Sequence, residues 1–350
     1  FLPDGPGVGV TPTSPNFSGP DNFRFITKWA QSVTHAERIP GQMRQALSIM
    51  KNGRPGPVML EMQRDVMGNE VSSLRDFRSP KRYVAAPDKS DLRAAVKKLL
   101  AAKKPVIWAG QGVLYAGASA ALTELAELTQ IPVITTMPGK SAFDERHPLS
   151  LGAANKSAPK GVWEWLKSSD VLFAIGASLT KTNFGINIPD GKTLIHSTAN
   201  YDDIDKEYTT DIGLIGDAAK TILMLIDEIK AEIGEEGRKS DSSNREAVAE
   251  VKKEWMNDWS ELLNSSMDPI NPYRLVNEIN KAVDHETTIV THDAGHPRDQ
   301  LMPFYTATVP HSYVGWGKST HLGYGIPLMI GAKIAHPEKM CINFMGDAAF

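Results

Sequence analysis

The order of apolar and polar residues along this chain follows two periods in alternation. Short apolar runs of four or five residues are typical of strands that are buried on both faces. Between them, apolar residues recur every three or four positions, as they do along one face of a helix. The apolar runs are 105–109, 132–135, 171–175, 193–196 and 212–215, and the helical stretches are the one that follows Asp91, 118–128 and 218–233. Strands that alternate with helices predict an α/β fold built on doubly wound parallel sheets.

The first 70 residues contain only one helix-to-strand step of a larger sheet. A stretch rich in Pro, Gly and Ser reaches Pro20, a helical pattern spans 40–50, and a strand-like run spans 58–62. One such step cannot cover both faces of a parallel sheet. Since Phe1 is also not a start methionine, we expect most of this domain to precede the chain.

A new domain is expected to begin near residue 268. Asn271 is a good helix N-cap and Pro272 suits a first helical turn. The strands predicted after this helix are 288–291, 312–314 and 340–345. The chain then divides into the C-terminal remnant of a first domain, a middle α/β domain, a linker with one helix, and the N-terminal part of a last domain. Their expected bounds are 1–75, 76–235, 236–267 and 268–350.

Loops rich in small residues follow the strands of this last region. They span 292–296, 315–323 and 346–348. Because the carboxyl ends of parallel strands share one edge of a sheet, these loops can converge on one ligand. Small residues let backbone N–H groups approach phosphate oxygens, and a carboxylate such as that of Asp347 can hold Mg²⁺ against a diphosphate. The ordered set of loops therefore predicts a site for a diphosphate and a metal.

Composition excludes several other classes of protein. The formal net charge is −3, with both signs interspersed, which argues against nucleic acid or an anionic membrane as a partner. No apolar run is long enough to cross a bilayer, and the N-terminus shows no signal peptide. The single cysteine, Cys341, lies in a strand that we expect to be buried, which excludes an intrachain disulfide and a zinc site built on cysteines. These features predict a cytoplasmic protein.

From about Val58 onward, the motifs in their order resemble the thiamine-diphosphate (ThDP) enzymes of the acetolactate synthase type. Residues 56–66 are similar to the motif that closes the first domain of that family, with Gln63 where proline is usual. Residues 323–332 match the helix that leads to the family's metal motif, and 346–350 match the opening of that motif. The resemblance implies consecutive Rossmann-like domains that bind the pyrimidine and the diphosphate of ThDP on either side of a middle domain. The first and last of these domains would be truncated here.

The resemblance also assigns residues to the cofactor. Asp347 would be the first Mg²⁺ ligand, while the second side-chain ligand would lie beyond Phe350. Leu322 would stand beneath the cofactor and keep it bent. The remaining positions implied to bind the cofactor are Ala294, Gly295, His296, Gly323, Gly346, Ala348 and Ala349. The family's activating glutamate would lie upstream of Phe1, so no catalytic residue is assigned. The full-length enzyme would be a homodimer or homotetramer, and the 350-residue chain would be inactive alone.

Each of these residues also has an ordinary structural interpretation. Taken alone, Asp347 could cap a turn and Leu322 could belong to a core. The histidines near the loops could be acid or base groups, or could be exposed or structural; they are His292, His296, His311 and His321. The glycines at 110 and 112 do not fit the dinucleotide fingerprint, so we interpret them as a strand-to-helix turn that could touch a nucleotide.

Departures from the family pattern bear on the cofactor and the substrate. Acetolactate synthases bind FAD in the middle domain partly through Arg and Asp residues, whereas segment 176–184 has no arginine or acid, and 197–200 replaces an acidic stretch. We therefore expect no stoichiometric FAD. Lys318, Ser319, Thr320 and His321 replace a glycine-rich sequence before Leu322, which suggests a different substrate.

Three functions remain open from the sequence. The first is decarboxylation of a 2-oxo acid with carboligation, as in acetolactate synthase, which would make the protein a transferase or lyase dependent on ThDP and Mg²⁺. The second is a ThDP-dependent decarboxylase or lyase that acts on another 2-oxo acid or an acyl-CoA. The third, from a different class, is a nucleotide-binding regulatory module built on the middle domain.

Overall fold

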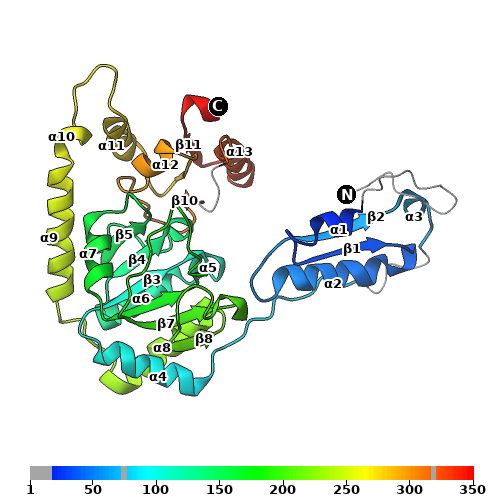
Figure 1. Ribbon diagram of the computed structural model, residues 1–350, viewed down its shortest axis with the longest axis horizontal. Helices are drawn as coiled ribbons and strands as arrows, with labels where there is room; N and C mark the ends of the chain where they lie inside the picture. The colour runs from blue at the N-terminus through cyan, green and yellow to red at the C-terminus, as the bar shows by residue number, and fades with distance from the viewer. Residues whose placement is uncertain (1–17, 72–76, 317–320) are drawn as a thin grey trace. The chain divides into compact units, whose positions relative to one another are not determined.

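The computed structural model describes residues 18–71, 77–316 and 321–350. The chain divides into two compact units, Phe1–Ala85 and Ala86–Phe350 (Figure 1). Every strand pair in the described chain is parallel, which confirms the fold class expected from the alternation of strands and helices. No helix among the described residues combines the length and the apolar character needed to span a membrane.

The first unit is a two-stranded parallel sheet with its helices. Its elements are α1 (Gly19–Phe23), β1 (Trp29–Val33), a 3-10 turn (Ala36–Arg38), α2 (Ile39–Lys51), β2 (Val58–Met62) and α3 (Arg64–Met67). The structure confirms the predicted helix and strand between residues 40 and 62, and adds α1 and β1. The carboxylate of the buried Glu61 joins these elements, because it accepts hydrogen bonds from Gly19 N (2.9 Å) and Ser32 Oγ (2.7 Å). The Pro/Gly/Ser-rich stretch before residue 18 lies outside the described residues.

A six-stranded parallel sheet, ordered β5-β4-β3-β6-β7-β8, forms the base of the second unit. Its strands are β3 (Pro105–Ala109), β4 (Val133–Thr136), β5 (Ser150–Ala154), β6 (Val171–Ile175), β7 (Thr193–Thr198) and β8 (Ile212–Ile215). The chain winds outward in one direction from β3 and in the other from β6. This is the Rossmann order, with the topological switch point between those two strands.

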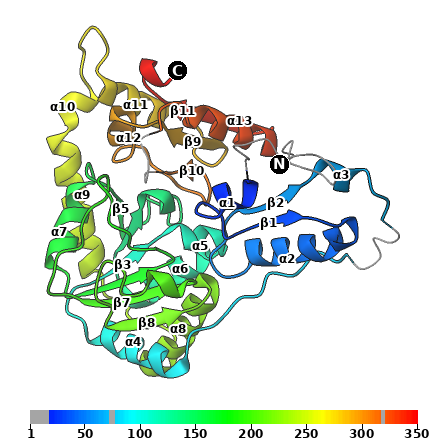
Figure 2. The same cartoon turned by 45° about the vertical axis from the view of Figure 1, so that its right-hand side comes forward.

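Helices cover both faces of the six-stranded sheet, as double winding requires. One face packs against α4 (Lys89–Ala101), α5 (Gln111–Tyr115), α6 (Ser119–Thr129) and α8 (Ala218–Ile233). The other packs against α7 (Lys160–Ser168) and α9 (Ser243–Asp258), which lie side by side in Figures 1 and 2. The N-cap of α4 is Asp88, three residues before the Asp91 that the pattern suggests, and its side chain accepts a hydrogen bond from Ser90 N (2.7 Å).

The stretch between α8 and α9 is held against the six-stranded sheet's helices. Arg238 N donates to the carbonyl oxygen of Leu128 at 2.8 Å, and its guanidinium donates to the carbonyl oxygen of Leu100 at 2.5 Å. Val248 and Val251 of α9 then enter the core beneath the sheet. Residues 238–251 of the segment expected to act as a linker therefore pack on the middle region.

A three-stranded parallel sheet, ordered β10-β9-β11, completes the second unit. Its elements are α10 (Ser260–Leu263), α11 (Pro272–Ala282), β9 (Thr288–His292), α12 (His296–Leu301), β10 (Tyr313–Val314), α13 (Gly325–Ala335), β11 (Met340–Phe344) and a 3-10 turn (Asp347–Ala349). The predicted start of α11 is confirmed, since Asn271 accepts a hydrogen bond from Tyr273 N (2.9 Å).

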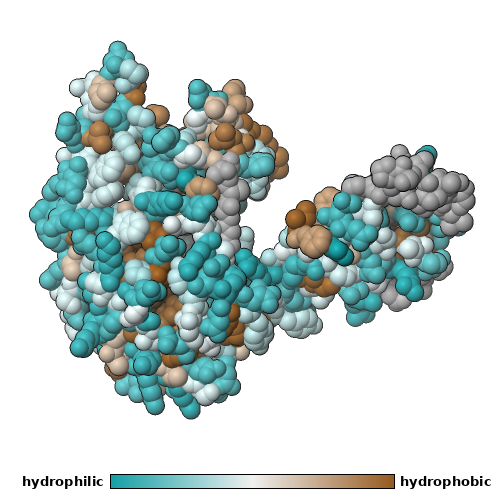
Figure 3. Space-filling view, viewed as in Figure 1, coloured by the Kyte–Doolittle hydropathy of each residue, from teal (hydrophilic) through white to brown (hydrophobic). Residues whose placement is uncertain are grey.

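The expectation that Cys341 lies in a buried strand is wrong. In the described chain β11 lies at an edge of its sheet, so it has a strand neighbour on one side only. Cys341 is partly exposed as a result, and Met340 is 56% exposed. Apolar side chains also gather at the surface of α13, where Ile330 and Ile334 are 56% and 75% exposed (Figure 3).

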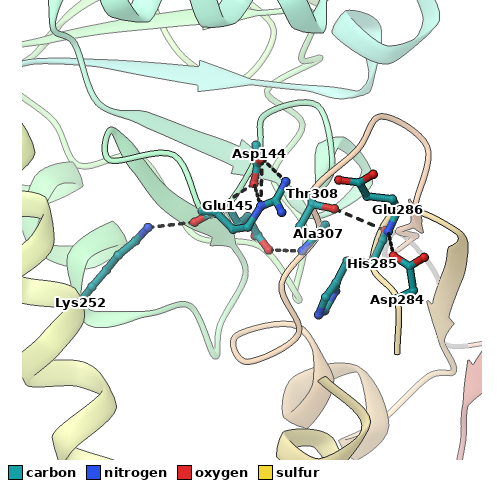
Figure 4. A network of polar contacts seen from close by, with 9 residues as sticks. Asp144, Glu145, Lys252, Asp284, His285, Glu286, Ala307 and Thr308 are labelled. Atoms are coloured by element: carbon teal, nitrogen blue, oxygen red, sulfur yellow. Dashed lines mark hydrogen bonds and ion pairs between the residues drawn. The ribbon is translucent and has the colours of Figure 1, made fainter. Parts of the chain in front are cut away.

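Buried polar contacts fix the three-stranded sheet to the six-stranded sheet (Figure 4). Glu145 follows β4, and both of its carboxylate oxygens accept hydrogen bonds from Lys140 Nζ at 2.5 Å. Its Oε2 also accepts a hydrogen bond from Ala307 N at 2.8 Å. Lys252 Nζ of α9 donates to the carbonyl oxygen of Glu145 at 3.0 Å. Burial lowers the pKa of Lys140, and the Glu145 carboxylate opposes this shift. Hydrogen bonds between Glu145 and Ala307 thus link the two sheets, since Glu145 N also donates to the carbonyl oxygen of Ala307 at 3.0 Å, and the buried ion pair with Lys140 holds the Glu145 carboxylate in place.

Candidate functional site

The carboxyl ends of β10, β9 and β11 meet at one edge of the three-stranded sheet. Val314 pairs with Thr291 and Phe344 pairs with His292, so neighbouring strands end at nearly the same level. The loops that follow these strands therefore start side by side, as the sequence predicted. This edge is where open α/β sheets bind their ligands.

Close backbone contacts bring several of the predicted site residues together. A Cβ atom added at Gly323 would lie 3.0 Å from the carbonyl oxygen of Ala349, and one added at Gly346 would lie 3.8 Å from Cγ of Pro297, next to His296. Gly295 and Gly323 have φ angles of +84° and +82°, a left-handed conformation that favours glycine. The loops after β9, β10 and β11 are thus in contact through small residues.

Asp293 connects these loops, although the sequence had pointed to it only as one member of a loop. Its side chain is fully buried, and Oδ1 accepts hydrogen bonds from Ala294 N (2.8 Å) and Gly323 N (3.0 Å). Oδ2 accepts from Gly325 N at 3.0 Å. The signal that singled out Asp347, an acid directly after a strand, applies equally to Asp293, and it could have found this residue.

The other predicted residues differ in exposure. Leu322 is 56% exposed, so it is not part of a core. Asp347 and Ala348 are exposed, and Asp347 Oδ1 accepts a hydrogen bond from Ala348 N at 2.9 Å. Ala294 and Ala349 are buried, at 4% and 8% exposed, while Gly295 and His296 are exposed. Lys318, Ser319 and Thr320 lie outside the described residues.

His292 is a structural histidine at the base of the site. Its Nδ1 lies 3.2 Å from the carbonyl oxygen of Asp293, and its Nε2 lies 3.4 Å from the backbone N of Trp316. These partners fit the neutral ring, with Nδ1–H donating and Nε2 accepting. Burial lowers the pKa of His292 to about 4. The remaining loop histidines are exposed; they are His296, His311 and His321.

Aromatic rings flank the carboxyl end of β10. The indole of Trp316 stacks on the His292 ring, with centroids 5.3 Å apart, and meets Tyr324 edge to face at 5.1 Å. Trp316 Nε1 donates to the carbonyl oxygen of His292 at 2.9 Å. Tyr324 directly follows Gly323 and is the N-cap residue of α13, so these rings lie next to the glycine turn.

The donor set at this edge fits a magnesium diphosphate. Mg²⁺ is usually held by one or two carboxylates together with phosphate oxygens and water. Among the described residues no group of three His, Cys, Asp or Glu side chains could hold a metal by itself. An exposed carboxylate at Asp347 beside glycine-rich backbone is consistent with an ion that takes its other ligands from a diphosphate.

At the switch point of the six-stranded sheet, glycines allow close packing of the main chain. A Cβ at Gly112 would lie 2.7 Å from Cα of Gly176, and a Cβ at Gly110 would overlap the carbonyl oxygen of Gly176. Gly112 N also donates to this oxygen at 2.8 Å. The expected strand-to-helix turn is confirmed, because α5 begins at Gln111. The chain itself fills the space next to both glycines.

Comparison with known proteins identifies the family. Two family models match the chain: "Thiamine pyrophosphate enzyme, central domain" over residues 92–225 and "Thiamine pyrophosphate enzyme, C-terminal TPP binding domain" over residues 293–350. The chain belongs to the thiamine pyrophosphate enzymes. Thiamine pyrophosphate is ThDP, so the family confirms the resemblance. The second match begins at Asp293 and contains the three loops of the site except His292.

Curated relatives include acetolactate synthases and a carboligase. The chain is 31% identical to the probable acetolactate synthase large subunit of Methanocaldococcus jannaschii, over 94% of this chain and 56% of the relative. It is 29% identical to the glyoxylate carboligase of Escherichia coli O157:H7, over 93% and 55%. The acetolactate synthase isozyme 1 large subunit of Escherichia coli K12 is 28% identical, over 93% and 56%. The chain thus spans little more than half the length of these relatives.

Proposed function

We propose that this protein is a ThDP- and Mg²⁺-dependent enzyme that decarboxylates a 2-oxo acid and joins the remaining acyl unit to an acceptor, as acetolactate synthase does. The observation that carries the proposal is the meeting of the three loops at one sheet edge. Contacts of Gly323 with Ala349 and of Gly346 with Pro297 place the ends of all three strands around one position. Membership of the thiamine pyrophosphate enzymes supports ThDP as the ligand at this position.

Each part of the edge has a task in this proposal. The Asp347 carboxylate would bind Mg²⁺, and the backbone amides near Gly295 and His296 would bind the diphosphate. The exposed, apolar Leu322 would support the organic part of the cofactor. Bound ThDP would supply the electron sink that cleavage beside a 2-oxo group requires, and the protein would orient it and exclude water. His292 would stay neutral and hold the backbone of Trp316.

The names of the relatives support small 2-oxo acids as substrates. Pyruvate is the first candidate, because acetolactate synthases are among the matches at about 30% identity. Glyoxylate is the second, because a glyoxylate carboligase matches at a similar identity. We also propose that the full-length protein assembles as a homodimer or homotetramer, which light scattering would measure.

Product analysis distinguishes these candidates. The full-length protein would be incubated with ThDP, Mg²⁺ and either pyruvate or glyoxylate, and the products would be separated by chromatography. We expect two pyruvate molecules to give one acetolactate and one CO₂. Release of a free aldehyde would instead indicate a simple decarboxylase. Selective use of glyoxylate would indicate a glyoxylate carboligase. Failure to consume any 2-oxo acid would contradict the proposal.

A further inference from the structure

The side-chain carboxylate of Asp293 is buried, and no cationic side chain among the described residues forms an ion pair with it. It is 0% exposed and follows the last residue of β9. Among the described residues no lysine, arginine or histidine forms an ion pair with it. Its oxygens are instead satisfied by the backbone N–H groups of Ala294, Gly323 and Gly325, at 2.8 to 3.0 Å. Burying a carboxylate is costly, and such amide contacts are what make it tolerable.

The main chain of Asp293 reaches the third loop. Its N–H donates to the carbonyl oxygen of Phe344 at 2.8 Å, at the end of β11. Three residues later comes Asp347, the proposed metal ligand. Asp293 therefore bonds to its own loop, to the turn around Gly323, and to the strand that leads to the metal loop.

The turn that Asp293 holds carries two other residues of the site. Leu322 directly precedes Gly323, and Gly323 itself contacts the carbonyl oxygen of Ala349. Gly325 is buried in the first turn of α13, where an N–H has no acceptor within the helix, so its N–H would be left unpaired if the carboxylate were lost. The N–H of the partly buried Gly323 would lose the same acceptor. A shift of this turn would move Leu322 and the metal loop together.

We infer that Asp293 is a positioning residue that fixes the Gly323 turn in its binding geometry before ThDP arrives. This inference rests on the proposed function. The carboxylate does not itself bind the cofactor or the metal, because both of its oxygens are buried and used by backbone amides. It lowers the cost of binding, since loops that are already ordered lose less freedom when the cofactor binds.

The direct test is Asp293→Asn in the full-length protein. Asparagine keeps the shape of the side chain, but its NH₂ group cannot accept a hydrogen bond, so at least one of the three N–H groups loses its acceptor. We expect calorimetry to show that ThDP binds about 10- to 100-fold more weakly in the presence of Mg²⁺. The KM for ThDP should rise by a similar factor, while kcat at saturating ThDP should change by less than about threefold.

Asp170→Asn is the matched control. Asp170 also accepts two backbone hydrogen bonds, from Lys103 N (2.7 Å) and Lys104 N (2.9 Å), but it lies at the start of β6, away from the loops. Its ThDP affinity should equal that of wild type. Unchanged affinity in Asp293→Asn would overturn the inference while leaving the proposed function intact. A wild-type protein that does not bind ThDP would overturn the proposed function instead.

Amide hydrogen exchange on the cofactor-free wild-type protein tests the same point without a variant. If Asp293 orders the turn in advance, the N–H groups of Gly323 and Gly325 exchange slowly without ThDP. Rapid exchange at both glycines, with protection only after ThDP and Mg²⁺ are added, would show that the cofactor orders the turn and would overturn the inference. This measurement decides the matter even if Asp293→Asn does not fold.

Discussion

Gly315, at the carboxyl end of β10, packs directly against the main chain of Met137. A Cβ atom at Gly315 would overlap the carbonyl oxygen of Met137, and backbone atoms cannot move aside as a flexible side chain can. This contact joins the edge of the three-stranded sheet to the turn that follows β4. Together with the hydrogen bonds between Glu145 and Ala307, it fixes the candidate site on the six-stranded sheet.

The contact predicts that Gly315→Ala lowers stability. Forcing a methyl group into filled space costs about 1–3 kcal/mol. Gly331→Ala is the control, because Gly331 lies within α13 and a Cβ there meets no atom within 4 Å. That change should be neutral or stabilising by up to about 1 kcal/mol. Denaturant unfolding of both variants is the measurement, and equal midpoints would show that the packing at Gly315 is looser than described.

His292 predicts a loss of stability in mild acid. Its pKa is lowered from 6.5 to about 4 by burial, so between these values the unfolded chain binds a proton that the folded chain does not. The free energy of unfolding therefore falls as the pH drops from about 6.5 towards 4, by up to about 3 kcal/mol from this residue. Above pH 6.5 the contribution is constant. The free energies of unfolding of wild type and His292→Gln should converge as the pH falls. Parallel pH profiles would count against a lowered pKa of His292.

The buried ion pair predicts a large effect of removing one partner. The side chains of Lys140 and Glu145 are 1% and 9% exposed, so Glu145→Gln leaves a buried ammonium without its counter-charge. A cost of about 3–5 kcal/mol is expected. Glu254→Gln breaks the exposed pair with Lys160 and should change stability little. Similar unfolding midpoints in the two variants would mean that Lys140 finds another partner or sheds its proton at low cost.

The sequence reveals strands best where burial is complete. All residues of β6, Val171–Ile175, are buried, and the apolar run 171–175 predicts the observed bounds of the strand. β5, Ser150–Ala154, is also largely buried, but its small residues give no apolar pattern, and β1, Trp29–Val33, is only partly buried. These two strands are held by pairing with β4 and β2, and a local pattern does not contain such pairing.

The site could be predicted as a set of loops but not as a set of contacts. Strand order and parallel pairing follow from the alternation of elements, and they bring the three loops to one edge. The contact of Gly323 with Ala349 depends on how α13 turns back onto β11, which is a tertiary feature. The sequence does not distinguish the buried Asp293 from the exposed Asp347, because both residues follow strands and share one local signal.

The middle sheet predicts that the full-length protein carries no stoichiometric FAD. Segment 176–184 follows β6 and has no arginine or acid to pair with a flavin's phosphate and ribose groups, and main-chain packing occupies the space beside Gly110 and Gly112. The absorbance spectrum of the purified protein is the measurement, with released flavin quantified after denaturation. About one FAD per chain would show that the middle domain binds flavin through other contacts, and would favour acetolactate synthase.

The exposed carboxylate of Asp347 leads to a prediction about Mg²⁺-dependent binding of ThDP. If its carboxylate binds Mg²⁺ against the diphosphate, Asp347→Ala should lose Mg²⁺-dependent binding of ThDP and keep the unfolding midpoint of wild type, because the side chain is exposed. Asp241→Ala is the control. Asp241 is also an exposed acid with a local backbone partner, Ser243 N at 3.0 Å, and it lies between α8 and α9. Its ThDP affinity should not change.

The most direct test of the central claim is a titration of the full-length protein with ThDP, followed by tryptophan fluorescence, with and without Mg²⁺. Trp316 stacks on His292 at the edge where the cofactor is proposed to bind, so it should report binding. We expect saturable quenching that requires Mg²⁺ in wild type and in Asp241→Ala and that is absent in Asp347→Ala. Quenching that is independent of Mg²⁺, or equal in wild type and Asp347→Ala, would contradict a magnesium diphosphate site at this edge.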